Sequence, residues 1–353
     1  MTLKRKIKQF LIHKILKSNN RKHPFDIDEA DSFRLSDESD INCTDSHYFS
    51  SHASDGTSFF FRLAKRGDKT TELWFCLKTR DGRIFVNPEQ LVSSDSCPAH
   101  IKSLEIGQKM EIEYTGNVAL ATIQNDHFAC LSQNRLSVNA LVTFNATMPP
   151  FDFTTGLDPL YVAEALAMEK WNKVFWANLR KNRQVHYEQA GTISLDVIIG
   201  DEKFEYTLPG MRDHSYGYRD WDYMNRHIWL MAIFDDGEIL NLNMVNYPHM
   251  HNLRTGYRSS KGKHTPTRAI SNLSLLGKDG KIPSQIKLEL TSLDGKSEVL
   301  TASRDFIVDF PFDNGKYHIF EGVGAFSIGQ RKARGIIEFG YHQDGGRWGK
   351  EDI

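Results

Sequence analysis

One short segment holds many of the side chains that could do chemistry. Residues 210–221 contain two arginines, two aspartates, one histidine and three aromatic residues. The segment lies between two strand-like runs, residues 203–208 and 226–234. Such groups are costly to bury unless they satisfy one another. The segment is therefore either a solvated loop or a polar network with a function.

A strand through this segment would divide its side chains between two faces. Asp213 and Ser215 would lie on one face, and Arg212, His214 and Tyr216 on the other. An aspartate beside a histidine can orient the imidazole and raise its pKa toward neutrality. We therefore expect His214 to be the proton donor of an active site, oriented by Asp213, with Tyr216 as its third member.

The arginines and tryptophans nearby are candidates for substrate binding. Arg212 and Arg219 could bind a substrate carboxylate or enolate, or pair with the neighbouring aspartates. Trp221 and Trp229 could stack on an unsaturated substrate or stabilise a cation. The alternative is structural, because Arg–Asp pairs beside a buried tryptophan often close the end of a barrel.

Three further polar residues interrupt strand-like runs. Glu188 and Gln189 could point into a pocket, and so could Glu338 in the glycine-containing segment 335–340. A sugar-processing enzyme would need Glu188 and Glu338 roughly 5–10 Å apart across a cleft. The chain has no Walker loop, no G-x-G-x-x-G opening a helix, no G-x-S-x-G and no H-E-x-x-H. We therefore expect neither a cofactor nor a metal.

Four segments, in their order along the chain, resemble a known superfamily. They are His186-Tyr187-Glu188-Gln189, residues 210–221, Glu321-Gly322-x-Gly324 and Glu338-Phe339-Gly340. Together they resemble the AttH-like / carotenoid hydratase (hydroxyneurosporene synthase) superfamily, and most closely its two-domain bacterial branch with the pattern HYEQ…GxRDHSWGxRDW. The resemblance covers residues 185–341 and is only architectural before them. It implies two lipocalin-like β-barrels and apolar, polyene-like substrates.

The resemblance also implies roles for particular residues. In the hydratase relatives, a histidine and the tryptophan two residues after it belong to the proposed acid-catalytic site. These positions correspond to His214 and Tyr216. Tyrosine in place of tryptophan removes an indole from the cation-stabilising wall and keeps an aromatic face. Asn241 and Asn243 are candidates for the place of the hydratases' catalytic aspartate.

Composition sets broad limits on the chain. Its 353 residues predict two domains, and 40% hydrophobic residues can form a sizeable core. A net charge of −1 gives no electrostatic reason to expect nucleic acid as a partner. The four cysteines lie far apart without metal-like spacing, which favours the reducing cytoplasm.

The hydrophobic pattern predicts a mainly β protein in four parts. Residues 1–23 read as a basic amphipathic helix, which could bind an anionic membrane surface or pack on the protein's own body. Residues 24–150 are expected to form an N-terminal lipocalin-like β domain. Residues 151–182 are expected to form a linking helix region, with Asp158 as N-cap and Pro159 in the first turn. Residues 183–353 are expected to form a C-terminal barrel that carries the RDHSYGYRDW motif.

The leading functional hypothesis is a cofactor-independent biosynthetic enzyme. It would hydrate, isomerise or cyclise a hydrophobic unsaturated substrate of isoprenoid or polyketide type. The alternative is a non-catalytic, lipocalin-like carrier of a lipid or pigment.

Overall fold

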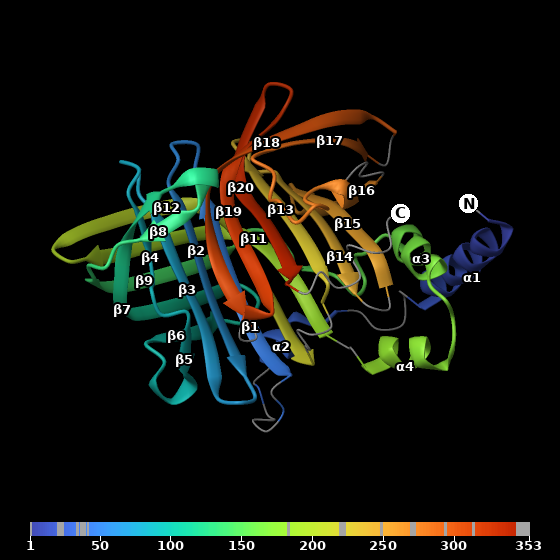
Figure 1. Cartoon of the computed structure of the whole chain (residues 1–353), viewed down its shortest axis with the longest axis horizontal. Coiled ribbons are helices and arrows are strands. Elements are labelled where there is room, and N and C mark those ends of the chain that lie inside the picture. Colours follow the sequence, from blue (N-terminus) through green and yellow to red (C-terminus); the bar gives the residue numbers. More distant parts are fainter. Residues whose placement is uncertain are drawn as a thin grey trace.

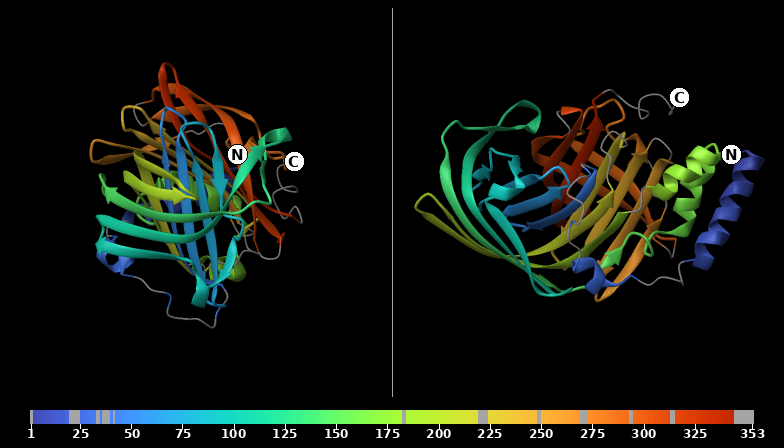
Figure 2. Two further views of the ribbon diagram at one scale, coloured as in Figure 1. Left: turned by 90° about the vertical axis from the view of Figure 1, so that its left-hand side faces the viewer. Right: turned by 90° about the horizontal axis from the view of Figure 1, so that it is seen from below.

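Two large β-sheets, each curled on itself, dominate the computed structural model (Figure 1). The structure describes residues 2–19, 25–32, 35, 40, 42–181, 184–218, 224–247, 250–268, 273–292, 295–312 and 315–343. The sheets lie side by side, and α1, α3 and α4 gather at one end of the molecule, beside the second sheet (Figures 1 and 2). The mainly β, two-barrel fold predicted from the sequence is confirmed.

The first sheet has twelve strands. Eight of them close a ring, because pairing runs from β1 through β2, β3, β4, β7, β9, β11 and β12 back to β1. The strands are β1 (Cys43–His52), β2 (Ser58–Arg66), β3 (Thr70–Lys78), β4 (Ile84–Val86), β5 (Leu91–Ser93), β6 (Ala99–Glu105), β7 (Lys109–Ile123), β8 (Ala129–Leu131), β9 (Leu136–Ala146), β10 (Phe151–Asp152), β11 (Gln184–Ile199) and β12 (Glu202–Tyr218).

The second sheet is a closed eight-stranded barrel in which neighbours in sequence are neighbours in space. Its strands are β13 (Arg226–Phe234), β14 (Ile239–Tyr247), β15 (Met250–Ser260), β16 (Lys263–Arg268), β17 (Gln285–Ser292), β18 (Ser297–Phe312), β19 (Tyr317–Ile328) and β20 (Arg331–His342).

The strands that carry the polar motif belong to the first barrel. β12 pairs antiparallel with β1, so that His214 lies opposite His47. β11 pairs with β12 and β9. The expectation that the motif lies in a C-terminal barrel beginning at residue 183 was therefore wrong. The prediction failed because β12 pairs with β1, the first strand of the chain. A local sequence pattern does not encode so distant a partner.

Helices fill the connection before β11 and the N-terminal region. The structure has α1 (Leu3–Asn19), α2 (Ile27–Asp31), α3 (Pro159–Met168) and α4 (Lys173–Lys181), with short 3-10 turns η1 (Ser94–Ser96), η2 (Asn125–His127) and η4 (Leu273–Leu275). The predicted start of α3 is confirmed, since Asp158 accepts a hydrogen bond from the Leu160 amide. The single linking helix expected from the sequence is two helices, because Glu169 adopts an extended conformation and ends α3.

Each barrel has an apolar core inside it, and another apolar core joins the two barrels. One lies inside the first barrel and another inside the second. The third lies between the barrels, where Trp74 of β3 stacks on Phe310 of β18 with ring centroids 3.9 Å apart. Strand β1, the first half of β11 and the second half of β12 therefore face a barrel interior on one side and the second barrel on the other. Polar side chains on either face must find partners within the protein.

A buried ion pair ties α2 to the first barrel. Arg212 of β12 donates two hydrogen bonds to the carboxylate of Asp31, at 2.9 and 3.0 Å. The Gly107 amide adds a third at 2.7 Å, and the Arg212 Nε donates to Gln189. Burial alone would raise the pKa of Asp31, but Arg212 holds it below its usual value. Arg212 and Gln189 thus act in the packing of the first barrel.

Removing this arginine should destabilise the fold. We expect Arg212→Met to lower the free energy of unfolding by about 3–5 kcal/mol, because it leaves a buried carboxylate without its cation. Urea denaturation followed by tryptophan fluorescence measures the change. Arg80→Met is the matched control, since Arg80 forms an exposed pair with Asp55 and should cost at most about 1 kcal/mol. Equal effects of the two substitutions would contradict this assignment.

Candidate active site

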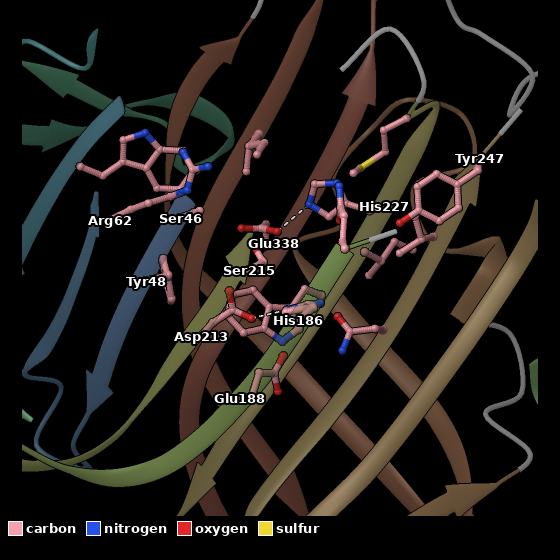
Figure 3. Close-up of a pocket in the computed structure, with 18 residues that line it drawn as sticks. Ser46, Tyr48, Arg62, His186, Glu188, Asp213, Ser215, His227, Tyr247 and Glu338 are labelled. Atoms are coloured by element: carbon pink, nitrogen blue, oxygen red, sulfur yellow. Dashed lines mark hydrogen bonds and ion pairs between the residues drawn. The ribbon is translucent and has the colours of Figure 1, made fainter. Parts of the chain in front are cut away.

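A cavity between the two barrels brings together histidine and carboxyl side chains from both of them. From the first barrel, His186 and Glu188 of β11 and Asp213 of β12 line it. From the second, His227 of β13 and Glu338 of β20 line it. Figure 3 shows these five side chains around one space between the strands. Arg62 of the first barrel also lines the cavity, and an apolar core surrounds it, so these ionisable groups interact strongly with one another.

Strand alternation brings the first three groups together. His186 and Glu188 are two residues apart on β11 and point the same way, and Asp213 lies opposite Glu188 on β12. The imidazole of His186 donates from Nε2 to Asp213, and it stacks on Phe153 with centroids 4.1 Å apart. One ligand atom from each of His186, Glu188 and Asp213 lies within 4.8 Å of the other two. The arrangement is an imidazole–carboxylate pair beside a second carboxyl group.

Glu188 is held as a neutral acid. Burial raises its pKa well above the usual value, and the charge of Asp213 raises it further. Its Oε2 accepts hydrogen bonds from the Asn241 amide and the Tyr257 hydroxyl. Because Oε2 accepts both bonds, the acidic proton resides on Oε1. The raised pKa of Glu188 suits this carboxyl group to the role of proton donor. Asn241 contacts this residue and does not line the cavity.

The second barrel contributes another imidazole–carboxylate pair. His227 donates from Nε2 to Glu338 Oε1 at 2.5 Å, and its Nδ1 lies 2.6 Å from the Tyr317 hydroxyl. Glu338 lies directly across the β19–β20 ladder from Glu321, and Tyr48 of the first barrel donates to Glu321 Oε1 at 2.6 Å. A continuous polar chain thus crosses the interface from β1 to β13.

The two carboxyl groups of this chain have opposite pKa shifts. Burial raises the pKa of Glu321 well above its usual value, and the neighbouring charge of Glu338 adds to the effect. Burial would raise the pKa of Glu338 as well, but the charge and hydrogen bond of His227 lower it. A proton bound by this pair is therefore favoured on Glu321 rather than on Glu338. Two carboxyl groups this close share one proton.

Gly340 makes room for His227. A Cβ atom at position 340 would lie 2.2 Å from the Cε1 atom of the His227 ring and 2.4 Å from the Tyr317 hydroxyl. Any side chain there would push the imidazole from its place. The glycine of the Glu338-Phe339-Gly340 segment thus leaves the space that the His227 ring of the neighbouring strand occupies.

The other face of β12 points into the first barrel. His214 is fully buried there, with Nε2 2.8 Å from Asp45 Oδ1 and Nδ1 2.9 Å from the Tyr187 hydroxyl. Tyr216 lies on this face beside it, with ring centroids 5.2 Å apart. Asp213 does not orient His214, because adjacent residues of a strand point to opposite faces. That pairing was predicted wrongly, and the partner of Asp213 is His186.

The cavity collects some of the predicted residues and not others. Asp213, Glu188, Trp229 and Glu338 line it. His214, Tyr216, Arg212 and Gln189 do not lie among its lining residues. Arg219 and Trp221 lie outside the described residues.

Two histidines of the cavity were missed as site residues by sequence reasoning. His186 lies two positions before Glu188, so alternation from that glutamate gives it the same face. His227 has the same relation to Trp229. Applying alternation outward from a chosen residue would have found both. The contact of His227 with Glu338 depends on the pairing of β13 with β20, the two ends of the second barrel.

Comparison with solved structures finds the same fold in other proteins. A protein from Nitrosomonas europaea described as a putative AttH has a TM-score of 0.50 and 10% identity, over 87% of this chain and 96% of that one. CghA, in complex with Sch210972, has a TM-score of 0.49 and 10% identity, over 85% and 88%. Kievitone hydratase from Nectria haematococca has a TM-score of 0.48 and 9% identity, over 88% and 93%.

At these identities the similarity concerns the fold alone, and the match to the Nitrosomonas europaea protein confirms the AttH-like architecture implied by the sequence resemblance. A comparison with curated protein sequences finds no significant match. The family described as a domain of unknown function, DUF7064, has a model that matches residues 28–343, and the chain belongs to this family.

Proposed function

We propose that the chain is an acid–base enzyme that hydrates, isomerises or cyclises an unsaturated, largely apolar substrate in the cavity between the barrels. One observation carries the proposal. A buried Glu188, whose pKa is raised, lies beside the hydrogen-bonded His186–Asp213 pair in one cavity. The addition of water to a double bond requires a proton donor and a proton acceptor in the same cavity, and these residues can supply both.

The proton movements balance as follows. Glu188 gives its Oε1 proton to one carbon of the double bond, and a carbocation forms at the other carbon. Asp213 accepts from His186 Nε2, which leaves the lone pair of the ring on Nδ1. A water molecule attacks the cation and loses a proton to this nitrogen, which gives the alcohol. The imidazolium then returns the proton to Glu188, so that only water and the double bond are consumed.

The same groups serve the two related reactions. In an isomerisation, His186 removes a proton from the carbon next to the cation, and the double bond re-forms at the new position. In a cyclisation, a second double bond of the substrate attacks the cation before this proton is lost. In all three reactions Asp213 and Glu338 supply negative charge near the cation.

The walls of the cavity favour an apolar substrate. Trp74 and Trp229 line it together with Ile319 and Val245. Indole faces bind double bonds and stabilise cations. The resemblance of residues 185–341 to the carotenoid hydratase superfamily supports the same substrate class.

A carrier for lipid or pigment explains the cavity less well. A carrier gains affinity from apolar contact, whereas this cavity holds an arginine, two histidines and three carboxyl groups, which cost desolvation free energy and are typical of catalytic sites. The sugar-processing alternative would use Glu188 and Glu338 as the reacting pair. Glu338 is bound to His227, however, and the lining offers aromatic and aliphatic walls.

The protonation of Glu188 can be measured directly. Its folded-state pKa lies above its unfolded value, so its contribution to stability is present at low pH and is lost as the pH rises through the folded pKa. We expect the labelled carboxyl carbon of Glu188 to report a protonated group by NMR at about pH 7. Glu188→Gln should also lessen the loss of stability above about pH 5, because glutamine keeps the neutral form.

The control is Glu205→Gln, on an exposed position of β12, which should leave the dependence of stability on pH unchanged. An ionised Glu188 at neutral pH would contradict the proposed role as proton donor.

Catalysis can be tested with a panel of conjugated polyenes and prenylated aromatic compounds. Mass spectrometry detects products that gain a water molecule, and reactions in D2O detect rearranged products that gain deuterium. We expect Glu188→Gln to lower the rate by about 10²–10⁴-fold, the contribution of one general acid. Binding of an apolar fluorescent probe in the cavity should persist in this variant. Glu205→Gln should retain full rate, and equal rates in both variants would sink the proposed role.

We also propose that α1 holds the protein against an anionic membrane surface. One face of α1 packs on α3, where Ile12 is buried with Ala163 and Leu166. Another face leaves five large apolar side chains between 47% and 75% exposed: Leu3, Ile7, Phe10, Leu11 and Ile15. Six lysines and arginines and no acidic residue accompany them in the helix. Such a helix suits the boundary between lipid headgroups and acyl chains. Within the described residues, no helix has the length and apolarity that crossing a bilayer requires.

Sedimentation with vesicles tests this contact. We expect binding to vesicles of phosphatidylcholine and phosphatidylglycerol, little binding to phosphatidylcholine alone, and weakening as salt is added. The double variant Ile7→Ser with Phe10→Ser should lose binding. Leu91→Ser removes a comparably exposed leucine from β5 and should keep it. Binding that is unchanged in the double variant would rule out α1 as the contact.

A further inference from the structure

Arg62 brings a buried positive charge to the cavity between the barrels. It is only 5% exposed, and it lies directly opposite Tyr48 of β1 and Trp74 of β3. Figure 3 shows Arg62 at one end of the lining side chains and Tyr247 at the other, with Glu338 between them. The proposed proton transfers do not use Arg62. A buried cation is costly to remove from water, so its place in this wall calls for a separate explanation.

Packing fixes the plane of the guanidinium group and leaves most of its edge available. The Cζ atom of Arg62 lies 4.8 Å from the ring centroid of Trp74 and 5.3 Å from that of Phe312. Aromatic rings contact the faces of a guanidinium group, whereas its five N–H donors lie along the edge. One of these donors, on Nη1, binds Glu72. Among the described residues, no other side chain or carbonyl accepts a hydrogen bond from Arg62.

The carboxylate that Arg62 binds is shared with a second arginine. Glu72 lies opposite Ala64, so its side chain is on the same face of the sheet as Arg62 and Arg66. Each of its two oxygens accepts from one of these arginines. Arg62 is the member of this trio that lines the cavity. One negative charge thus serves two guanidinium groups, and an anion in the cavity would complete the pairing of Arg62.

The charged groups farther along the cavity have partners of their own. Asp213 accepts a hydrogen bond from His186, and Glu338 accepts one from His227. Within the part of the chain that the structure describes, Arg62 forms an ion pair with neither carboxylate. The positive charge of Arg62 is therefore not taken up by the proposed acid–base groups.

Ser46 adds a hydroxyl group at the same end of the cavity. It lies two residues before Tyr48 on β1, which gives it the same face, and it lines the cavity. Because Tyr48 is opposite Arg62, Ser46 is a diagonal neighbour of Arg62, and such neighbours lie roughly 7–8 Å apart. Within the described residues its Oγ atom has no hydrogen-bond partner. A ligand oxygen between the two side chains can therefore accept from both.

Strand pairing gives the spacing between Arg62 and the proposed proton donor. Glu188, Asp213, Tyr48 and Arg62 lie directly opposite one another on four successive strands, β11, β12, β1 and β2. Neighbouring strands are about 4.8 Å apart, so the backbones at Glu188 and Arg62 are roughly 14 Å apart. Both side chains extend into the cavity, which leaves on the order of 10 Å between a group bound at Arg62 and a carbon atom at Glu188. An extended chain covers this distance in about eight bonds.

We propose that Arg62 and Ser46 bind the carboxylate of the substrate, which is an unsaturated carboxylic acid whose reacting double bond lies about eight bonds from the acid group. The place of the double bond rests on the proposed function, whereas the carboxylate site rests on the cavity alone. The sequence predicted this role for Arg212 or Arg219. Arg212 is bound to Asp31 inside the first barrel, and Arg219 lies outside the described residues.

Binding of cis-parinaric acid and of its methyl ester tests the proposal without any turnover. The fluorescence of the tetraene reports binding, and the two probes differ in the charge of the head group. We expect Arg62→Met to weaken binding of the acid by about 10–100-fold, the effect of losing hydrogen bonds to a charged group. Binding of the ester should not change. The control is Arg83→Met, which removes a more exposed arginine paired with Glu202 and should leave both affinities unchanged.

A second variant tests the charge with Arg62 in place. Glu72→Gln keeps an acceptor for Arg62 and removes the shared negative charge, so the acid should bind about fivefold more tightly and the ester as before. An arginine that only braced Trp74 would give equal losses of acid and ester in Arg62→Met and no tightening in Glu72→Gln. Either result overturns the proposal. Circular dichroism establishes that the variants are folded, and Glu72→Gln decides the matter should Arg62→Met fail to fold.

The carboxylate site and the proposed function can fail separately. Glu188→Gln should bind the acid as the unchanged chain does, because Glu188 lies at the far end of the row from Arg62. Turnover that is lost in Glu188→Gln, together with an acid affinity that does not depend on Arg62, would refute the carboxylate site and leave the acid–base function standing. An acid affinity that depends on Arg62 supports the site even where Glu188→Gln keeps full turnover.

Discussion

Burial of three strands on both faces is the constraint on which the rest of the structure depends. β1, the first half of β11 and the second half of β12 form a wall of the first barrel and also face the second barrel. Strands in that position are usually apolar on both faces, yet these carry charged residues on both. Each charge therefore needs a partner from elsewhere in the fold, because an unpaired buried charge costs several kcal/mol, about as much as a domain can lose. Two such pairs lie on opposite faces of β12. Arg212 pairs with Asp31 on one face, and Asp213 pairs with His186 on the other.

The two pairs differ in whether their polar groups remain available for chemistry. On the barrel side, the guanidinium of Arg212 donates to Asp31, Gln189 and the sulfur of Met110, so its donors are used in holding the fold. On the interface side, the surplus of carboxyl groups is resolved by protonation. Glu188 and Glu321 remain neutral while Asp213 and Glu338 stay paired with histidines. A network whose carboxyl groups can hold protons is suited to proton transfer. A network in which arginine neutralises the carboxylate contributes only to stability.

The sequence predicted features that depend on neighbouring residues, but not the contacts between residues far apart in the chain. Strand alternation predicted which residues of 212–216 share a face, and Asp158 with Pro159 predicted where α3 begins. Both are properties of neighbouring residues, and the structure agrees with them. The partners lie beyond the reach of such patterns. Asp45, Asp31 and Tyr187 come from three other elements, and they determine that His214 is enclosed. The barrel to which β12 belongs follows from its pairing with β1, which no local pattern encodes.

The position of His214 also limits what a family motif transfers. A role assigned by motif position assumes that the residue meets the substrate from the same side in both proteins. Here His214 has no exposed surface, and its two nitrogens face Asp45 and Tyr187. A double bond in the cavity between the barrels would meet the residues before and after it, Asp213 and Ser215, which point the other way. If proton transfer takes place in that cavity, it falls to the neighbouring strand, where His186 and Glu188 point toward the same space.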